Sequence, residues 1–235
     1  MFETFNQVHD GFLFVAIFLA AITVVSTKFL GSDFNWFYGK AIGILLISHQ
    51  IYFHCMHIWI LHTYTVQKCL PLHLCSLSVF VVAIALITDA QRIINAALVW
   101  SPAAAMLGLL FPALENAPWN SFSVLEFFWS HILVLVGVLY LALQENFNLS
   151  LKKIPVYCSS LIILSLAFVY PLNRLLDANY MYLQKLAEPG PMSAFPAPPG
   201  QIPVFMLLFL LLSTIQYCFY ISLRRLLKIE SVHVL

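Results

Sequence analysis

Long runs of hydrophobic residues, separated by short polar breaks, dominate the chain. A helix that crosses a lipid bilayer needs about 20 apolar residues, and most of these runs reach that length. We predict seven membrane-spanning helices, which cover residues 11–31, 37–63, 72–89, 92–113, 123–144, 154–174 and 202–228. The fourth contains Pro102 and Pro112 and should be kinked. The pattern predicts an all-α, polytopic membrane protein in which residues 1–235 form a single transmembrane domain.

The composition excludes a water-soluble fold. Hydrophobic residues make up 62% of the chain and charged residues only 9%, whereas soluble domains carry roughly 25% charged residues. The 11 Lys and Arg residues nearly balance the 10 Asp and Glu residues, for a net charge of +1. Nothing in this balance favours a nucleic acid as partner.

Lysine and arginine are unevenly distributed between the two sets of connections. Eight lie between helices 1 and 2, 3 and 4, 5 and 6 or after helix 7: Lys28, Lys40, Arg92, Lys152, Lys153, Arg224, Arg225 and Lys228. The other set holds Lys68, Arg174 and Lys185. Because cytoplasmic connections carry the excess of positive charge, we predict an outer N-terminus and an inner C-terminus. The acidic segment before the first helix differs from a signal peptide, so this helix is expected to remain in the mature protein.

Polar side chains inside the predicted helices gather toward the outer side. Such side chains are costly in a bilayer and usually face a bundle interior or a wet cavity. The spacing of Gln50, His54 and His57 places them on one stripe of the second helix. The predicted topology brings a further set to the same side: His73, Cys75, Glu126, His131, Asn179 and Tyr180. The outer half of the bundle is therefore the predicted functional site.

A proline-rich connection, residues 187–203, precedes the last helix on the same outer side. It holds six prolines and almost no charge, so it cannot be helical throughout. Two interpretations remain open, a stiff extended linker and an apolar lid over the outer site.

The outer cluster contains the residue types of a thiol-dependent enzyme. Cys75 lies in the first turns of a predicted helix, whose positive dipole end favours a thiolate. His131 is the candidate base, and Glu126 or Asn179 could orient its imidazole, although Glu126 lies five residues earlier and faces another side of the helix. A lone cysteine in a membrane helix is also a common packing residue.

Two other arrangements compete with a free nucleophile. His54, His57, His73, His131 and Cys75 form a possible nitrogen and sulfur ligand set for a metal or haem. No recognised ligand spacing is present, so we expect no metal and no cofactor. A disulfide between Cys69 and Cys75 on the oxidising outer side would abolish the nucleophile.

Three motifs give the chain a family resemblance. They are the stretch from Leu70 to Cys75, the Ser130-His131 pair and the stretch from Asn179 to Leu183. Together they resemble the bacterial YwaF-like integral membrane proteins, which look related to transmembrane protein 164, a cysteine-centred acyltransferase that remodels ether phospholipids. The resemblance implies that Cys75 accepts the acyl group and that His131 is its partner. It also implies a bacterial plasma membrane, and it assigns no role to Asn179 or Tyr180.

The leading hypothesis is thus a multi-pass enzyme of the cell membrane with its active site toward the outer side. It would transfer a fatty acyl group from a phospholipid to a lysophospholipid through a Cys75 thioester, with His131 as general base and then general acid. The supporting residues would be His73, His54, His57, Gln50, Glu126, Asn179 and Tyr180. One alternative is a haem- or metal-binding membrane protein that uses His54, His57 and His131. Another is a non-enzymatic lipid-binding protein whose polar cluster fixes helix packing.

Overall fold

The computed structural model describes residues 3–112, 114, 117–186 and 195–229, and the secondary structure of these residues is entirely helical. The first part of the chain forms α1 (Gln7–Phe29), α2 (Ser32–Cys55), its π-helical extension η1 (Met56–Ile60), α3 (Leu74–Thr88), α4 (Gln91–Leu110) and α5 (Phe122–Leu143). The second part forms α6 (Ile154–Leu164), the π-helical turn η2 (Ser165–Val169), α7 (Tyr170–Leu176), the short η3 (Tyr180–Tyr182) and α8 (Gln201–Leu227).

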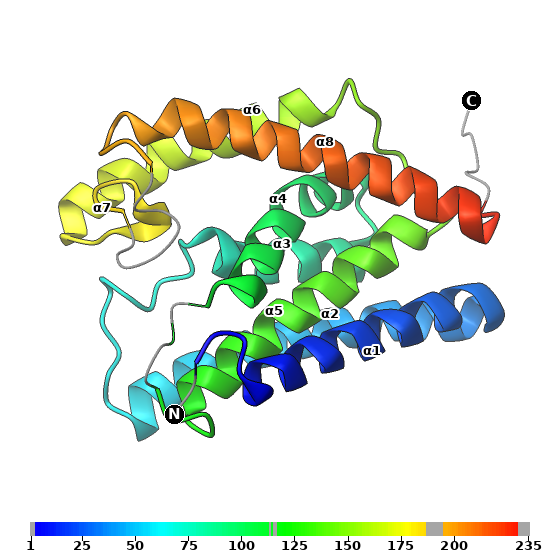
Figure 1. Cartoon of the computed structure of the whole chain (residues 1–235), viewed down its shortest axis with the longest axis horizontal. Coiled ribbons are helices and arrows are strands. Elements are labelled where there is room, and N and C mark those ends of the chain that lie inside the picture. The colour runs from blue at the N-terminus through cyan, green and yellow to red at the C-terminus, as the bar shows by residue number, and fades with distance from the viewer. Residues whose placement is uncertain (1–2, 113, 115–116, 187–194, 230–235) are drawn as a thin grey trace.

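The helices confirm the predicted fold class. In the described part of the chain six helices are long and apolar enough to cross a membrane, and the shorter apolar helix α3 makes the seventh predicted span. The stretch from α6 through η2 to α7 counts as one of the six. In Figure 1, α1, α5 and α8 all run from left to right, as the first, fifth and seventh crossings of one membrane must. Which side of the membrane each end faces remains a prediction.

Local signals explain where the observed helix ends differ from the predicted ones. The first helix begins at Gln7 because the side chain of Asn6 accepts hydrogen bonds from the backbone N–H groups of Val8 and His9 and so caps it. The fourth helix ends before Pro112, so only Pro102 lies inside it. Of the predicted proline-rich connection, residues 187–194 lie outside the described residues, and residues 201–203 already belong to α8.

Helix α5 is the centre of the bundle and passes between the other helices in Figure 1. It packs against α1, α2, α3 and α4 and is the most deeply buried of the candidate spans. The approach of α3 is close, since a Cβ atom on Gly137 of α5 would lie 2.7 Å from Cγ1 of Val82. The small residue therefore allows the helix that carries Cys75 to lie directly against the helix that carries His131.

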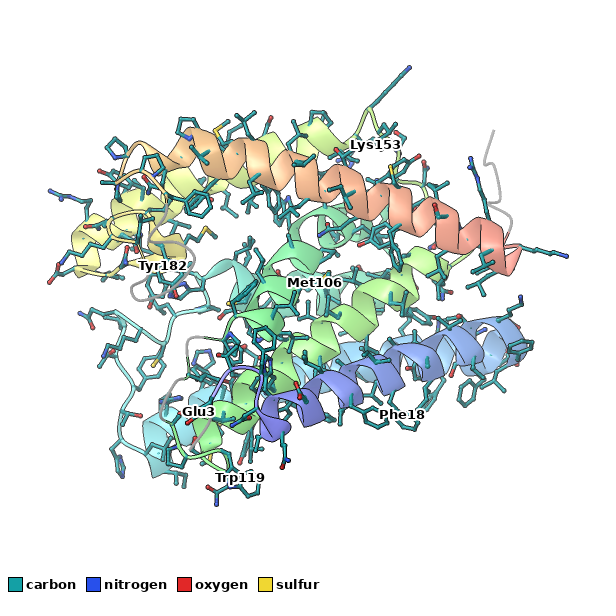
Figure 2. All side chains as sticks on the ribbon, in the orientation of Figure 1. Glu3, Phe18, Met106, Trp119, Lys153 and Tyr182 are labelled. Carbon is teal, nitrogen blue, oxygen red and sulfur yellow. The ribbon has the colours of Figure 1, made fainter. Side chains whose placement is uncertain are left out.

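The outermost helices present their apolar side chains away from the bundle. Phe14, Ile17 and Phe18 of α1 are 68%, 70% and 55% exposed, and Figure 2 shows Phe18 at the edge of the molecule. Helix α8 has a similarly exposed face, which includes Leu207 and Phe219. These faces are suited to contact with lipid acyl chains, because a bilayer solvates apolar side chains that water does not.

Two basic side chains satisfy backbone carbonyl groups at the ends of the central helices. Lys40 of α2 donates hydrogen bonds to the carbonyl oxygens of Leu86 and Ile87, at 2.9 and 3.0 Å, and pairs with Asp89. At the end of α5, Arg224 of α8 donates to the carbonyl oxygens of Ala142 and Gln144, at 3.0 and 2.7 Å. The final carbonyls of a helix have no partner within the helix, so these contacts fix the C-terminal ends of α3 and α5.

Candidate functional site

Cys75 is the second residue of α3 and is half-buried. The backbone N–H groups of Cys75 and Ser76 contribute to the electrostatic environment of its sulfur. Both belong to the first turn of the helix, where backbone N–H groups are otherwise free to bind an anion. All five cysteines are free thiols, so the alternative of a disulfide between Cys69 and Cys75 is wrong. Cys75 is thus available as a nucleophile in this structure.

The carboxyl group that interacts with Cys75 belongs to Glu126, in the first turns of α5. Glu126 lies near enough to Cys75 for the two groups to interact electrostatically. Its Oε1 atom is 3.9 Å from Nε2 of His49 on α2, and the two side chains are only 18% and 8% exposed. Glu126 therefore does not orient His131, as one interpretation of the sequence held. Because it lies five residues before His131, it faces α2 instead.

His49 is the one residue of this cluster that the sequence analysis missed. It stands beside Gln50, which was assigned to the polar stripe of the second helix. A different signal could have found it, because Ile42, Leu46 and His49 recur at helical spacing and the first two are fully buried. The inward stripe of α2 therefore ends in a histidine at the depth of the site.

His131 lies deep in α5 and is 5% exposed. Its Nδ1 atom is 2.6 Å from the carbonyl oxygen of Phe127. A carbonyl group only accepts hydrogen bonds, so Nδ1 carries the proton of the neutral ring and Nε2 is left with the free lone pair. The Nε2 edge packs on Gly108 of α4, where a Cβ atom would lie only 2.5 Å away. His49 is close enough to interact with His131 electrostatically, whereas no hydrogen bond joins Cys75 and His131 among the described residues.

The residues of the predicted polar stripe, Gln50, His54 and His57, contact side chains near them in the sequence. Nε2 of Gln50 lies 3.2 Å from Nε2 of His54, and Nδ1 of His57 lies 2.7 Å from the hydroxyl of Thr63. Among the residues that the structure describes, no three His, Cys, Asp or Glu side chains come together to hold a metal ion. The predicted ligand set of His54, His57 and His131 therefore finds no support in the geometry.

His73 connects the start of α3 to the segment after α7. Its ring lies 5.1 Å from that of Tyr180 and 5.3 Å from that of Tyr182, and its Nδ1 atom accepts a hydrogen bond from the backbone N–H of Met181. Burial lowers the pKa of His73 and raises the pKa of Tyr182. Met181 and Tyr182 both have left-handed backbone conformations, with φ of 56° and 54°, which are costly for residues with a Cβ atom. Figure 2 labels Tyr182 in this segment.

Tyr180 and Asn173 hold the connection that precedes Cys75. Tyr180 is completely buried, and its hydroxyl donates to the carbonyl of Val66 at 2.6 Å and accepts from the N–H of Leu70 at 3.0 Å. Asn173 exchanges two hydrogen bonds with the backbone of Tyr180, at 2.8 and 2.9 Å. These contacts give Tyr180 a structural place, next to the nucleophile but not in contact with it.

Asn179 organises the same segment from the other side. Its side chain accepts hydrogen bonds from the N–H groups of Gln184 and Lys185 and donates to the carbonyl of Lys185. These hydrogen bonds stay within residues 179–185, so Asn179 closes a turn, and none of them joins it to His131.

An apolar cleft of about 90 Å³ opens between the start of α3 and the stretch from α6 to α7. Its lining has no polar side chain: Leu72, Leu77, Leu164, Phe168, Val169, Leu172 and Met181. Leu72 and Leu77 flank Cys75 in the sequence. The cleft therefore offers an apolar surface near the nucleophile.

These features define the class of the protein, a polytopic helical membrane protein with a polar cluster buried among α2, α3 and α5. The chain belongs to the TMEM164 family, whose sequence profile matches residues 4–217. That range contains α1 to α7 and the greater part of α8, and so every residue of the cluster. No curated protein and no solved structure matches the chain significantly.

Proposed function

We propose that the protein is a membrane-embedded acyltransferase that moves a fatty acyl group from a phospholipid to a lysophospholipid through a thioester on Cys75. The observation that carries the proposal is the position of Cys75. Its thiol lies at the N-terminal end of a helix, and Glu126 of α5 interacts with it electrostatically. Glu126 lies 3.9 Å from His49 of α2, which in turn interacts with His131.

One feature of the environment of Cys75, its place at the start of a helix, favours a thiolate nucleophile. A thiolate, and not a thiol, attacks an ester, and a helix N-terminus stabilises negative charge on sulfur. The same N–H groups can accept the charge that develops on the carbonyl oxygen of the ester during attack. The site is therefore chemically suited to acyl transfer, in which a thiolate forms first and negative charge then develops on the ester carbonyl oxygen.

His131 is the proposed partner of the thiol. With Nδ1 bound to the Phe127 carbonyl, Nε2 takes the proton of Cys75 as the thiolate forms and returns it to the sulfur when the acyl group leaves. The missing hydrogen bond to Cys75 does not exclude this role, because catalytic hydrogen bonds are often long in enzymes without substrate. Substrate binding between α3 and α5 would have to complete the pair.

The membrane setting favours transfer over hydrolysis. Lipid ester groups reach a site in the outer half of the bundle from the bilayer itself, and the apolar cleft beside α3 provides a surface for an acyl chain. Little water enters such a site, so the thioester survives until a lysophospholipid hydroxyl arrives. The outer orientation of this site and the plasma membrane location are parts of the same proposal.

Labelled phospholipid and lysophospholipid in vesicles with the purified protein test the proposal. Transfer of label is expected for the wild type and for Cys218→Ala, whose thiol is exposed on α8. It should disappear in Cys75→Ala and in His131→Ala. A labelled adduct on Cys75 that hydroxylamine releases would identify the thioester. Undiminished transfer by both site variants would refute the mechanism, and absence of transfer by the wild type would favour the lipid-binding alternative.

A further inference from the structure

His49 and Glu126 form a buried pair that the thiol chemistry does not use. They come from different helices, α2 and α5, and Nε2 of His49 lies 3.9 Å from Oε1 of Glu126. The separation is that of an ion pair and is too long for a hydrogen bond. The side chain of His49 is only 8% exposed. A histidine and a carboxyl group buried side by side are costly to desolvate, and such pairs often mark a functional site.

The second ring nitrogen of His49 points to a ligand. Nδ1 is fully buried, and no described residue gives it a hydrogen-bond partner. Buried polar atoms are nearly always hydrogen-bonded, and each exception needs an explanation. A substrate oxygen is one such explanation, because it would be present only when the site is occupied.

The position of the pair restricts which oxygen this is. Glu126 interacts electrostatically with Cys75, and His49 does so with His131. The free nitrogen therefore lies among the groups that would surround the reacting ester. In acyl transfer the sulfur and the glycerol oxygen both exchange a proton, and His131 is assigned only to the sulfur.

We propose that His49, positioned by Glu126, donates a proton to the departing glycerol oxygen and later accepts one from the incoming hydroxyl group. This inference rests on the proposed acyl transfer through Cys75. It adds a second catalytic residue, His49, which touches the substrate, and a positioning residue, Glu126. Glu126 would act on His49 as the carboxylate of a catalytic triad acts on its histidine: it orients the ring and stabilises the charged form of the ring.

The two half-reactions balance with two bases. In the first, the Cys75 proton passes to His131, and the thiolate sulfur forms a bond to the ester carbon. The carbon–oxygen bond then breaks, and the departing glycerol oxygen takes the Nδ1 proton of the His49 imidazolium. In the second, a lysophospholipid hydroxyl attacks the thioester and gives its proton to Nδ1 of His49. The carbon–sulfur bond breaks, and the sulfur regains its proton from His131, which restores the starting state.

A comparison of two acyl donors tests this division of roles. A phospholipid releases an alkoxide, which needs a proton, whereas a 4-nitrophenyl ester of the same fatty acid releases a phenolate, which leaves without one. Acylation of Cys75 is measured as the hydroxylamine-sensitive adduct for wild type, His49→Gln, Glu126→Gln and His131→Ala. His62→Asn is the matched control, since this histidine is exposed beyond η1.

His49→Gln and Glu126→Gln are expected to lose acylation by phospholipid by a factor of about 100 or more, as loss of a general acid does. Acylation by the nitrophenyl ester should stay within a few-fold of wild type, and His131→Ala should lose both. If His49 and Glu126 had a merely structural role, their variants would lose acylation by both donors equally, and that result would overturn the inference. If Cys75→Ala still transferred acyl groups, the proposed function itself would fail.

Discussion

Gly108 allows the His131 ring to lie directly against α4, and a single methyl group at this position should displace it. In Gly108→Ala the new Cβ atom would meet both Nε2 and Cδ2 of His131 at 2.5 Å. Ordinary contacts of this kind lie about 1 Å further apart. The ring has little room to move away, because Nδ1 is held 2.6 Å from the Phe127 carbonyl and the Phe127 ring lies 4.1 Å from it.

The expected cost follows from these contacts. Insertion of a methyl group into a packed core destabilises a protein by about 1 to 3 kcal/mol. Loss of the Nδ1 hydrogen bond would add about 1 kcal/mol if the ring rotates out of place. A displacement of about 1 Å at a catalytic base costs on the order of 100-fold in rate. We therefore expect a modest loss of thermal stability and a much larger loss of acyl transfer.

The assay compares Gly108→Ala with Gly11→Ala, because the Cβ atom at Gly11 of α1 would meet no atom within 4 Å. Both changes replace glycine by alanine inside a helix, so any gain in helix propensity is shared. Transfer in vesicles and the melting temperature in detergent are measured for each. Full activity of Gly108→Ala, with Gly11→Ala as active as wild type, would show that the position of His131 does not matter for the reaction.

Three further predictions concern the surroundings of the site. Tyr180→Phe should lower stability by about 1 kcal/mol and reduce transfer, because the Val66 carbonyl and the Leu70 N–H lose their shared partner; thermal melting and the vesicle assay measure both effects. Acidification below about pH 6.5 should destabilise the fold through His73, since burial lowers the pKa of this side chain and the unfolded chain then binds a proton that the folded chain does not; melting temperatures across this range measure the loss. Treatment with EDTA should leave acyl transfer unchanged, because no metal takes part in the proposed steps.

Each of these predictions has its own control. Tyr170→Phe removes a hydroxyl from a half-exposed tyrosine of α7 and should change little. His73→Asn keeps an acceptor for the Met181 N–H but cannot titrate, so the acid-dependent part of the loss should shrink relative to wild type. Equal pH dependence in the two proteins would contradict the role of His73. Loss of transfer after EDTA, with recovery on addition of a metal, would favour the metal-binding alternative.

The sequence predicted the helices well because the signal for them is strong. A run of about 20 apolar residues has few structural options in a bilayer, and α5 was predicted to within one residue at each end. At the start of α1 the Asn6 cap moved the boundary to Gln7. The short helix α3 was also predicted, although its composition alone does not separate a span from a buried helix.

The partners within the site were harder to predict. Spacing along one helix showed that Glu126 and His131 face different sides of α5, yet it could not show what each side meets. The pairing of Glu126 with His49 depends on how α2 and α5 rotate against each other, which the packing of many side chains decides. The contacts of Tyr180 with Val66 and Leu70 join segments more than 100 residues apart, and no local pattern encodes them.

The length of α3 has a consequence for where a lipid ester must be to react. Its 15 residues extend about 22 Å, whereas the hydrocarbon core of a bilayer is about 30 Å thick. Lys40 and Asp89 hold its C-terminal end, so in a bilayer of this thickness the deficit would fall at the N-terminal end, where Cys75 lies. Backbone at such a depth must have its polar groups satisfied by protein, which is what Tyr180 does for Val66 and Leu70. A helix about five residues too short would thereby place the nucleophile below the membrane surface, so that a lipid ester would have to reach Cys75 within the bilayer.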